Sequence, residues 1–151
     1  MSSRLTHALV RGLDWLATRS PIKSQMPVLP AHQLTGRQGE QDAYFYLRRL
    51  GYIMVARNFR SPRRKGEIDL IGWDGDVLCF IEVKTRTSHD VKPAQAAVDG
   101  EKQRELAVMA REYLHRLRYP PTWRFDVLSV YYEEKSALPK FELFKNAFGL
   151  S

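Results

Sequence analysis

The segment from Gly66 to Arg86, GEIDLIGWDGDVLCFIEVKTR, constrains the fold more than any other part of the chain. Two apolar runs flank the residues Asp-Gly-Asp, a pattern typical of a β-hairpin. The second run is apolar on both of its alternating faces, so we expect a central strand that is covered on both sides. Four charged residues nevertheless interrupt this hairpin, and they need an explanation: Glu67, Asp69, Glu82 and Lys84.

The turn decides whether Asp69 and Glu82 share a face, because side chains alternate along a strand. Two-residue loops at Asp74-Gly75 or at Gly75-Asp76 both put the two carboxylates on one face. The second loop would place them directly opposite each other, with Cβ atoms roughly 4.5–5.5 Å apart. A three-residue loop without a bulge would instead put them on opposite faces.

Two adjacent carboxylates repel each other and are unfavourable near an apolar core. Lys84 relieves only part of this repulsion, and a divalent cation would relieve more. Oxygen ligands at short range suit Mg²⁺ or Mn²⁺. Solvated charges are the alternative, but the apolar residues around Asp69 and Glu82 make solvation difficult. The hairpin therefore favours a site for Mg²⁺ or Mn²⁺.

A helix is predicted from His32 to Leu50, because this segment has a helical period and is followed by Gly51. Glu40 falls on the apolar stripe of this helix rather than on its wet face. A core-facing Glu needs a partner, and Gly36 and Gly39 would let the helix approach the sheet closely. If the stripe packs over the hairpin, Glu40 meets the two hairpin carboxylates. The apolar members of the stripe are Ala43, Leu47 and Leu50.

The remaining segments predict a mixed α/β domain with one central sheet of about five strands, flanked by helices. Strands are expected at 52–59, 66–73, 77–86, 123–132 and 140–148. A long helix is expected from about 94 to 117, where Pro120 and Pro121 stop it. One side of that helix carries Leu106, Ala110, Tyr113, Leu114 and Leu117.

Composition and leader signals limit the class of protein. The chain has 151 residues, of which 44% are hydrophobic, enough for one domain with a core. Cys79 is the single cysteine, so no intramolecular disulfide forms and a reducing compartment fits. No apolar run of about 18 residues is present, and the N-terminus lacks the pattern of a signal peptide. We therefore expect a cytoplasmic protein with no membrane partner, comprising a flexible or loosely docked arm at 1–31 and a domain at 32–151.

The net charge of +7 favours a polyanionic partner. Basic side chains crowd into the segment RNFRSPRRK, in which Ser61 and Pro62 indicate a loop. Five phosphate contacts from this loop would give log K against log salt a slope of roughly −4.5, at about −0.9 per contact. The expected DNA-binding residues are Arg57, Arg60, Arg63, Arg64 and Lys65.

The hairpin resembles the signature of the restriction-endonuclease-like nucleases, an Asp followed at a distance by Asp/Glu-x-Lys. Asp69, Glu82 and Lys84 match its three positions. More closely, the blocks GRQGEQDAYFYLRRLGY, RNFR, GEIDLI, FIEVKTR, RFDVLSV and NAF resemble the small bacterial YraN-type family, itself similar to Holliday-junction resolvases. The resemblance covers about Leu34 to Phe148 and leaves the N-terminal arm outside.

This resemblance implies a metal-dependent DNA endonuclease, one that selects branched or junction DNA by its structure. Asp69 and Glu82 would ligate one or two Mg²⁺ or Mn²⁺ ions, with the backbone carbonyl of Val83 as a further oxygen ligand. Glu40 matches a helix glutamate that joins the metal site in resolvase-like relatives. Lys84 would position the attacking water or stabilise charge on the phosphate, and the sequence leaves open whether it acts as a base. No small-molecule cofactor is expected.

Several further assignments stay open at this stage. Arg86 is expected to contact a phosphate or to form a surface salt bridge, and Glu67 to touch the site or to be solvated. Lys102 and Gln103 open the second helix, where they would hold a phosphate or form an exposed first turn. The alternatives to an endonuclease are a non-catalytic nucleic-acid-binding module on a nuclease scaffold and, more distantly, a protein-interaction adaptor. A homodimer would suit cleavage of both strands of a symmetric junction.

Overall fold

The computed structural model describes residues 31–86, 98–133 and 138–149, with side chains from Gly36 onward in its first helix. The predicted order of elements and the α/β fold class are confirmed. Residues 1–30, most of the predicted N-terminal arm, lie outside the described residues. The elements are α2 (Ala31–Arg49), β1 (Ile53–Phe59), β2 (Ile68–Asp74), β3 (Val77–Arg86), α4 (Gly100–Leu114), β4 (Thr122–Tyr131) and β5 (Lys140–Phe148).

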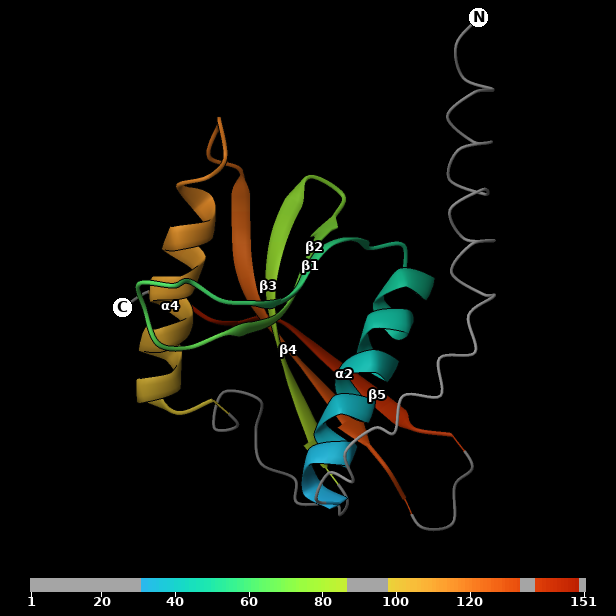
Figure 1. The fold of residues 1–151 in the computed structure, drawn as a ribbon. Helices are drawn as coiled ribbons and strands as arrows, with labels where there is room; N and C mark the ends of the chain where they lie inside the picture. Colours follow the sequence, from blue (N-terminus) through green and yellow to red (C-terminus); the bar gives the residue numbers. More distant parts are fainter. Residues whose placement is uncertain (1–30, 87–97, 134–137, 150–151) are drawn as a thin grey trace, which may run out of the picture.

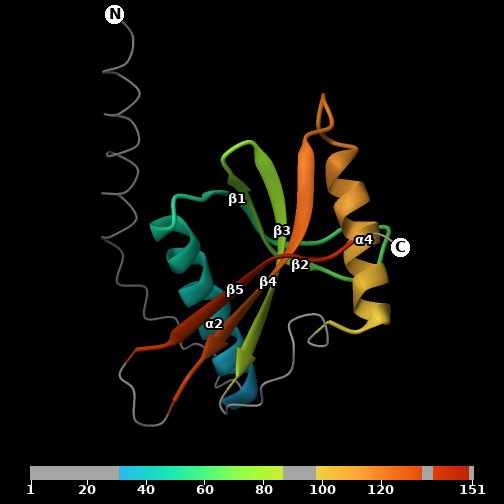
Figure 2. The ribbon, with the colours of Figure 1, turned by 180° about the vertical axis from the view of Figure 1, so that it is seen from behind.

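The five strands form one mixed sheet in the order β1-β2-β3-β4-β5. β3 pairs with β4 in parallel, while the other neighbouring strands are antiparallel. A parallel pair needs a long crossover connection, and α4 lies within that connection. The helices lie on either side of the twisted sheet (Figures 1 and 2). β3 is therefore the central strand expected from its apolar sequence.

The hairpin has the second of the two registers that the sequence allowed. Asp74 pairs with Val77 across a loop of Gly75 and Asp76, and Gly75 has a φ of 59° that a glycine adopts without strain. The ladder runs in this register as far as Leu70 and Ile81. Continued by one pair, it places Asp69 opposite Glu82.

Each face of the sheet has its own core, and β3 contributes to both. Leu78 and Phe80 pack toward α4, whose buried residues include Leu106 and Met109. Cys79 and Ile81 alternate with them and pack on the other face, where α2 contributes Ala43 and Leu47. The expected apolar side of α4 is confirmed for Leu106, Ala110, Tyr113 and Leu114, while Leu117 packs against the same core from beyond the end of the helix.

Two details of the sequence prediction were wrong. The second helix begins at Gly100 rather than near residue 94, because the side chain of Asp99 caps it by accepting a hydrogen bond from the Lys102 N–H at 2.8 Å. It ends at Leu114, three residues before the predicted Leu117. Leu50 does not join the buried stripe: it follows the last turn of α2 and is 51% exposed.

The close approach of α2 to the sheet depends on Gly39. A Cβ atom at this position would collide with the Thr85 side chain of β3, with Thr85 Oγ1 nearest and Thr85 Cβ at 3.2 Å. A Cβ atom on Gly36 would meet nothing within 4 Å, so the expected role in close packing holds for Gly39 and is wrong for Gly36.

Asp126 in β4 is a structural carboxylate. It is fully buried, and its Oδ1 accepts hydrogen bonds from Arg124 Nε at 2.8 Å and from the Asn146 N–H at 2.9 Å. Arg124 also pairs with Asp74 at 2.6 Å, as does Lys145 at 2.7 Å. These contacts compensate Asp126 in the middle of the sheet and Asp74 at the β2–β3 turn, and the two cations lower the pKa of Asp74 to about 2.

The Gly39 contact predicts opposite effects of alanine at two nearby helix positions. Gly39→Ala should destabilise the protein by about 1–3 kcal/mol, because the new methyl group overpacks against Thr85. Gly36→Ala should stabilise it by about 0.5–1 kcal/mol, since alanine is the better helix former and the position has room. Urea unfolding of both variants measures the difference. Adding Thr85→Ala should reduce the destabilisation caused by Gly39→Ala, because it removes the side chain that the new methyl group meets. Equal effects of the two glycine substitutions, or no such reduction, would contradict the packing argument.

Candidate active site

Asp69 and Glu82 lie just past the end of the β2–β3 ladder. They are only 7% and 5% exposed. The N–H of Val83 donates a hydrogen bond to Asp69 Oδ2 at 2.7 Å, so the side chain of β2 holds the backbone of β3 at this point. The structure thus brings together the two carboxylates that the hairpin register predicted, in a largely buried position.

Two lysines from different elements approach Glu82. Lys84 follows Glu82 by two residues on β3, and its Nζ lies 3.0 Å from Glu82 Oε1. Lys102, in the first turn of α4, has its Nζ 3.5 Å from Glu82 Oε2. Although Lys102 is this close, Glu82 Oε2 is buried and has no hydrogen-bond partner. One oxygen of the Glu82 carboxylate therefore lacks a hydrogen bond.

The Asp69 carboxyl is strongly perturbed. Burial is the main cause and the neighbouring charge of Glu82 adds to it, raising the pKa of Asp69 to about 8. The hydrogen bond from Val83 and the charge of Lys102 oppose this rise in pKa, while Glu40 adds to it. Without a bound cation, the two carboxylates together thus carry less negative charge near neutral pH than two ordinary carboxylates would.

Glu40 is near enough to affect the charge of Asp69, but it does not form a close group with the two carboxylates. Its Oε2 accepts a hydrogen bond at 2.9 Å from Asn58 Nδ2 at the end of β1. The apolar stripe of α2 packs on the face of Cys79 and Ile81, whereas alternation places Glu82 on the face of Phe80. Glu40 consequently acts on Asp69 through its charge, and its role as a metal ligand stays a prediction.

The donor atoms at this position are oxygens, the type of ligand that a hard divalent cation prefers. Carboxylate and carbonyl oxygens are the ligands that Mg²⁺ and Mn²⁺ prefer, and the unsatisfied Glu82 Oε2 would gain a partner. A cation would also favour the ionised form of Asp69 against the effect of burial. Within the described ranges, no three Asp, Glu, His or Cys side chains form a group able to hold a metal ion.

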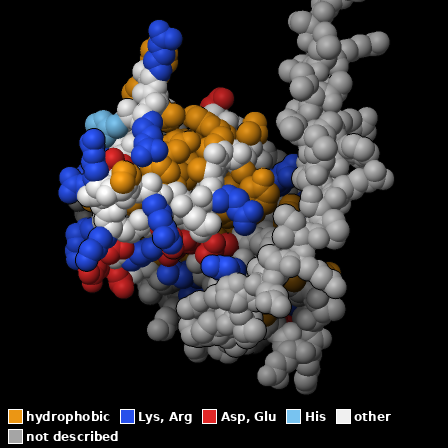
Figure 3. All heavy atoms as spheres, in the orientation of Figure 1, with side chains coloured by type: hydrophobic (Ala, Val, Ile, Leu, Met, Phe, Trp, Pro, Cys, Tyr) orange, Lys and Arg blue, Asp and Glu red, His pale blue; other side chains and the backbone are white. Residues whose placement is uncertain are grey.

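Two hollows are lined by Glu67, which precedes Asp69 by two residues, and one of them also by Lys102, the partner of Glu82. The first, here the Arg57 hollow, has a volume of about 530 Å³ and is lined by Arg37, Glu40, Gln41, Arg57, Asn58, Arg60 and Glu67. The second, here the Arg64 hollow, has a volume of about 390 Å³ and is lined by Arg60, Ser61, Arg64, Lys65, Gly66, Glu67 and Lys102. Figure 3 shows blue side chains gathered over this part of the surface, with red ones among them.

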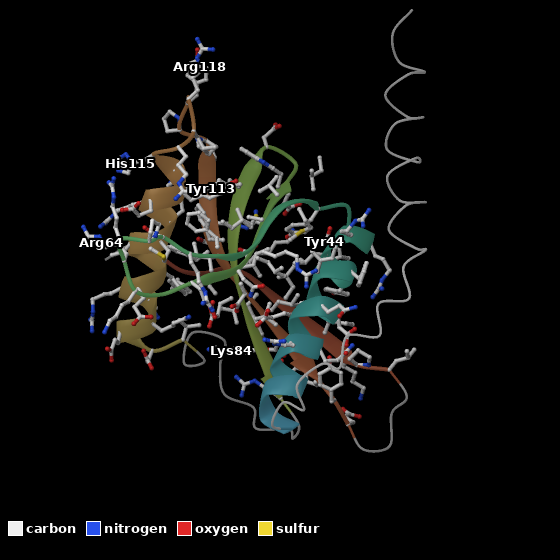
Figure 4. The ribbon with its side chains drawn as sticks, viewed as in Figure 1. Tyr44, Arg64, Lys84, Tyr113, His115 and Arg118 are labelled. Atoms are coloured by element: carbon white, nitrogen blue, oxygen red, sulfur yellow. The ribbon has the colours of Figure 1, made fainter. Side chains whose placement is uncertain are left out.

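The loop between β1 and β2 carries the basic residues and lies against α4, as Figure 1 shows. Gly66 in this loop has a φ of 109°, and a Cβ atom there would lie 3.5 Å from the Cβ of Glu105. Figure 4 places Arg64 beside α4 and Lys84 on β3. Of the five predicted phosphate contacts, only Arg63 lines neither hollow, and its backbone N–H donates to Ser61 Oγ at 3.2 Å.

Other predicted contacts have local partners in the structure. The Gln103 side chain donates to the Val98 carbonyl oxygen at 2.8 Å, which supports the start of α4. Arg86 is half-buried at the end of β3, and its carbonyl oxygen accepts a hydrogen bond from the Tyr132 N–H. Arg57 lies over the Tyr44 ring, with 4.8 Å between its Cζ and the ring centroid. Their contacts with DNA stay predictions.

Asn58 is the main residue that sequence reasoning missed. It has a φ of 46°, a conformation that asparagine adopts more readily than most residues, and its side chain holds Glu40. The signal was the Asn inside RNFR, at the end of a predicted strand. The approach of Lys102 to Glu82 had no such signal, because it depends on how α4 packs across the sheet.

The order of elements and the acid-acid-lysine set on the hairpin define a protein of the restriction-endonuclease-like superfamily. Residues 39–130 match the model of the "Uncharacterised protein family UPF0102". The chain belongs to this family, which is the YraN family that the sequence blocks resemble.

Curated relatives agree with this assignment. A UPF0102 protein of Koribacter versatilis is 50% identical over 125 residues, which cover 83% of this chain and 86% of the relative. A UPF0102 protein of Solibacter usitatus is 47% identical over a match that covers 75% of this chain and 84% of the relative. A third, of Pelotomaculum thermopropionicum, is 38% identical, covering 78% and 98%. Neither helix that the structure describes is long and apolar enough to cross a membrane.

The raised pKa of Asp69 predicts a specific pH dependence of stability. The folded-state value of about 8 lies above the unfolded value of about 3.9. Between these values the folded state holds a proton that the unfolded state has lost, so the free energy of unfolding falls as pH rises from about 4 to about 8. Asp69→Asn should remove this fall, since the amide does not ionise and its oxygen still accepts from Val83.

Unfolding of both proteins from about pH 5 to about pH 8, in chelator, measures the effect. The difference in stability between the variant and the wild type should grow with pH. The control is Asp76→Asn in the exposed hairpin turn, which should follow the wild type. A difference between Asp69→Asn and the wild type that does not change with pH would contradict the prediction.

Proposed function

We propose that this protein is a divalent-metal-dependent DNA endonuclease that selects branched or otherwise structured DNA. The observation that carries the proposal is the buried pair of Asp69 and Glu82, which the Lys102–Glu82 ion pair links to a hollow lined by basic residues. A structural carboxylate would be expected to have both of its oxygens hydrogen-bonded, as Asp126 has. Glu82 Oε2 is buried without a hydrogen-bond partner, and this free acceptor supports a place for a cation.

In this proposal Asp69, Glu82 and the carbonyl oxygen of Val83 would hold the metal. The chemistry that Mg²⁺ or Mn²⁺ supplies when bound is stabilisation of charge on the scissile phosphate and activation of water as a nucleophile. Glu40, held by Asn58, would tune the charge at Asp69 from the side of the Arg57 hollow.

Lys84 would orient the attacking water or stabilise charge on the phosphate. It is suited to either role because its Nζ is tethered to Glu82 while the side chain is still 31% exposed. Lys102 would stabilise the ionised form of the carboxylate pair, an assignment its distance from Glu82 supports. Its side chain also lines the Arg64 hollow, so it could lie close to a bound phosphate as well.

The two hollows would receive the phosphodiester backbone. Six basic residues line them, and phosphate contacts of this kind position a nucleic acid without reading its bases. Recognition by backbone shape is therefore the mode that this surface favours, and it suits junctions, flaps or strand ends. A homodimer and a cytoplasmic location belong to the same proposal.

Neutralising either hairpin carboxylate should abolish cleavage. Glu82→Gln and Asp69→Asn are expected to weaken Mn²⁺ binding and to slow cleavage of a branched-DNA panel by at least roughly 100-fold, since each removes a charged ligand. Calorimetric titration of Mn²⁺ and gel assays measure the two effects. Asp76→Asn, with the same loss of charge in the exposed turn, should match the wild type.

The outcome also separates the endonuclease from its main alternative. Metal binding and cleavage that disappear together in both variants support catalysis. DNA binding by the wild type with neither metal uptake nor cleavage would favour a non-catalytic nucleic-acid-binding module. Weak, salt-insensitive DNA affinity would favour a protein-interaction adaptor.

The Arg64 hollow makes a separate prediction about salt dependence. Replacing Arg64 and Lys65 by alanine should make the slope of log K against log salt less negative by roughly 1.8, because about 0.9 is lost per phosphate contact. Fluorescence anisotropy with a labelled duplex at several salt concentrations measures the slope. An unchanged slope would mean that the Arg64 hollow lies outside the DNA path.

A further inference from the structure

One ion pair divides the surface beside the carboxylates. Arg60 and Glu67 line both the Arg57 hollow and the Arg64 hollow. Their side chains form a salt bridge, in which Arg60 Nε donates to Glu67 Oε2 at 2.6 Å. The pair thus forms a shared wall between two hollows that are otherwise lined by different residues.

Each hollow is lined by a different side chain whose charge acts on the carboxylate pair. Glu40 lines the Arg57 hollow and Lys102 lines the Arg64 hollow. Both of their charges affect the pKa of Asp69, which lies two residues after Glu67 on β2. A chain of phosphates that runs through both hollows would therefore have to pass the Arg60–Glu67 pair in order to cross the site.

The ion pair is weak enough to be displaced. The Arg60 side chain is 72% exposed and that of Glu67 is 31% exposed, and exposed pairs are screened by water and salt. A phosphodiester offers Arg60 the same kind of charged oxygen acceptor that Glu67 offers. The other basic residues of the hollows would hold neighbouring phosphates of the same chain close to Arg60.

We propose that the Arg60–Glu67 ion pair is a gate that the phosphodiester backbone opens. A polynucleotide long enough to occupy both hollows takes Arg60 from Glu67, and the two hollows then become one continuous path across the carboxylate pair. Glu67 is thus a competitor of the substrate for Arg60. The inference rests on the proposed function, since it assumes that nucleic acid lies in these hollows.

Binding measurements in chelator test the gate without any dependence on cleavage. Glu67→Gln should raise the affinity for a branched oligonucleotide by about two- to five-fold at about 0.1 M salt, the range expected for an exposed ion pair. The matched control is Asp76→Asn, which removes the same charge roughly 20 Å along the hairpin, at about 3.3 Å per residue. The control should leave the affinity essentially unchanged, because this separation exceeds the Debye length.

A double-mutant cycle distinguishes competition for Arg60 from a general gain in positive charge. Arg60→Gln alone should weaken DNA binding, and Glu67→Gln should then bring no further gain in that background. Arg60→Lys keeps the charge, so in its background the gain from Glu67→Gln should persist. Circular dichroism confirms folding of each variant. A gain from Glu67→Gln that is as large with Arg60→Gln as with Arg60, or that equals the control, would overturn the gate.

The source of the phosphate is tested with inorganic phosphate as a competitor. Millimolar phosphate should displace the oligonucleotide only weakly, because it occupies one position rather than both hollows. Displacement by micromolar phosphate would overturn the gate in favour of a small-anion site. Failure of the gate differs from failure of the proposed function: in the first case the wild type still binds DNA in a salt-sensitive way, and in the second it does not.

Discussion

The covering of β3 on both faces is the constraint on which the rest of the structure depends. α4 packs on the side of Phe80 and α2 on the side of Ile81. A carboxylate in the second half of β3 therefore has little contact with solvent. Glu82 is buried for this reason, and the antiparallel register of β2 adds Asp69 beside it. The repulsion and the desolvation at the site both follow from the way in which the sheet is covered.

Two groups of carboxylates on the same sheet have different electrostatic environments. Arg124 pairs with both Asp74 and Asp126, Lys145 pairs with Asp74, and the pKa of Asp74 is lowered. At the far end of the hairpin, burial and repulsion raise the pKa of Asp69, although Lys102 lies nearby. The first arrangement stabilises the fold. The second leaves a position that is unfavourable without a ligand, and such positions are typical of functional sites.

Much of this could be predicted from local patterns. The hairpin turn, the alternation along β3 and the apolar period of α4 are each encoded within a few consecutive residues, which is why the order of elements was correct. Errors arose where one local interaction outweighs the pattern: the Asp99 cap moved the start of α4, and Leu50 fell beyond the last turn of α2. Gly39 was correctly expected to allow close packing, but only the packed structure distinguishes it from Gly36.

By itself the sequence determined the hairpin, the two carboxylates on one of its faces and the concentration of basic residues in the loop that precedes it. Strand alternation and turn length decide these features, and both are local. Only the tertiary structure decided that α2 covers the face opposite Glu82, that Lys102 reaches Glu82 from α4, and that Arg60 and Glu67 separate two hollows. These contacts join residues from different elements, and their geometry depends on how the helices and the loop pack around one twisted sheet.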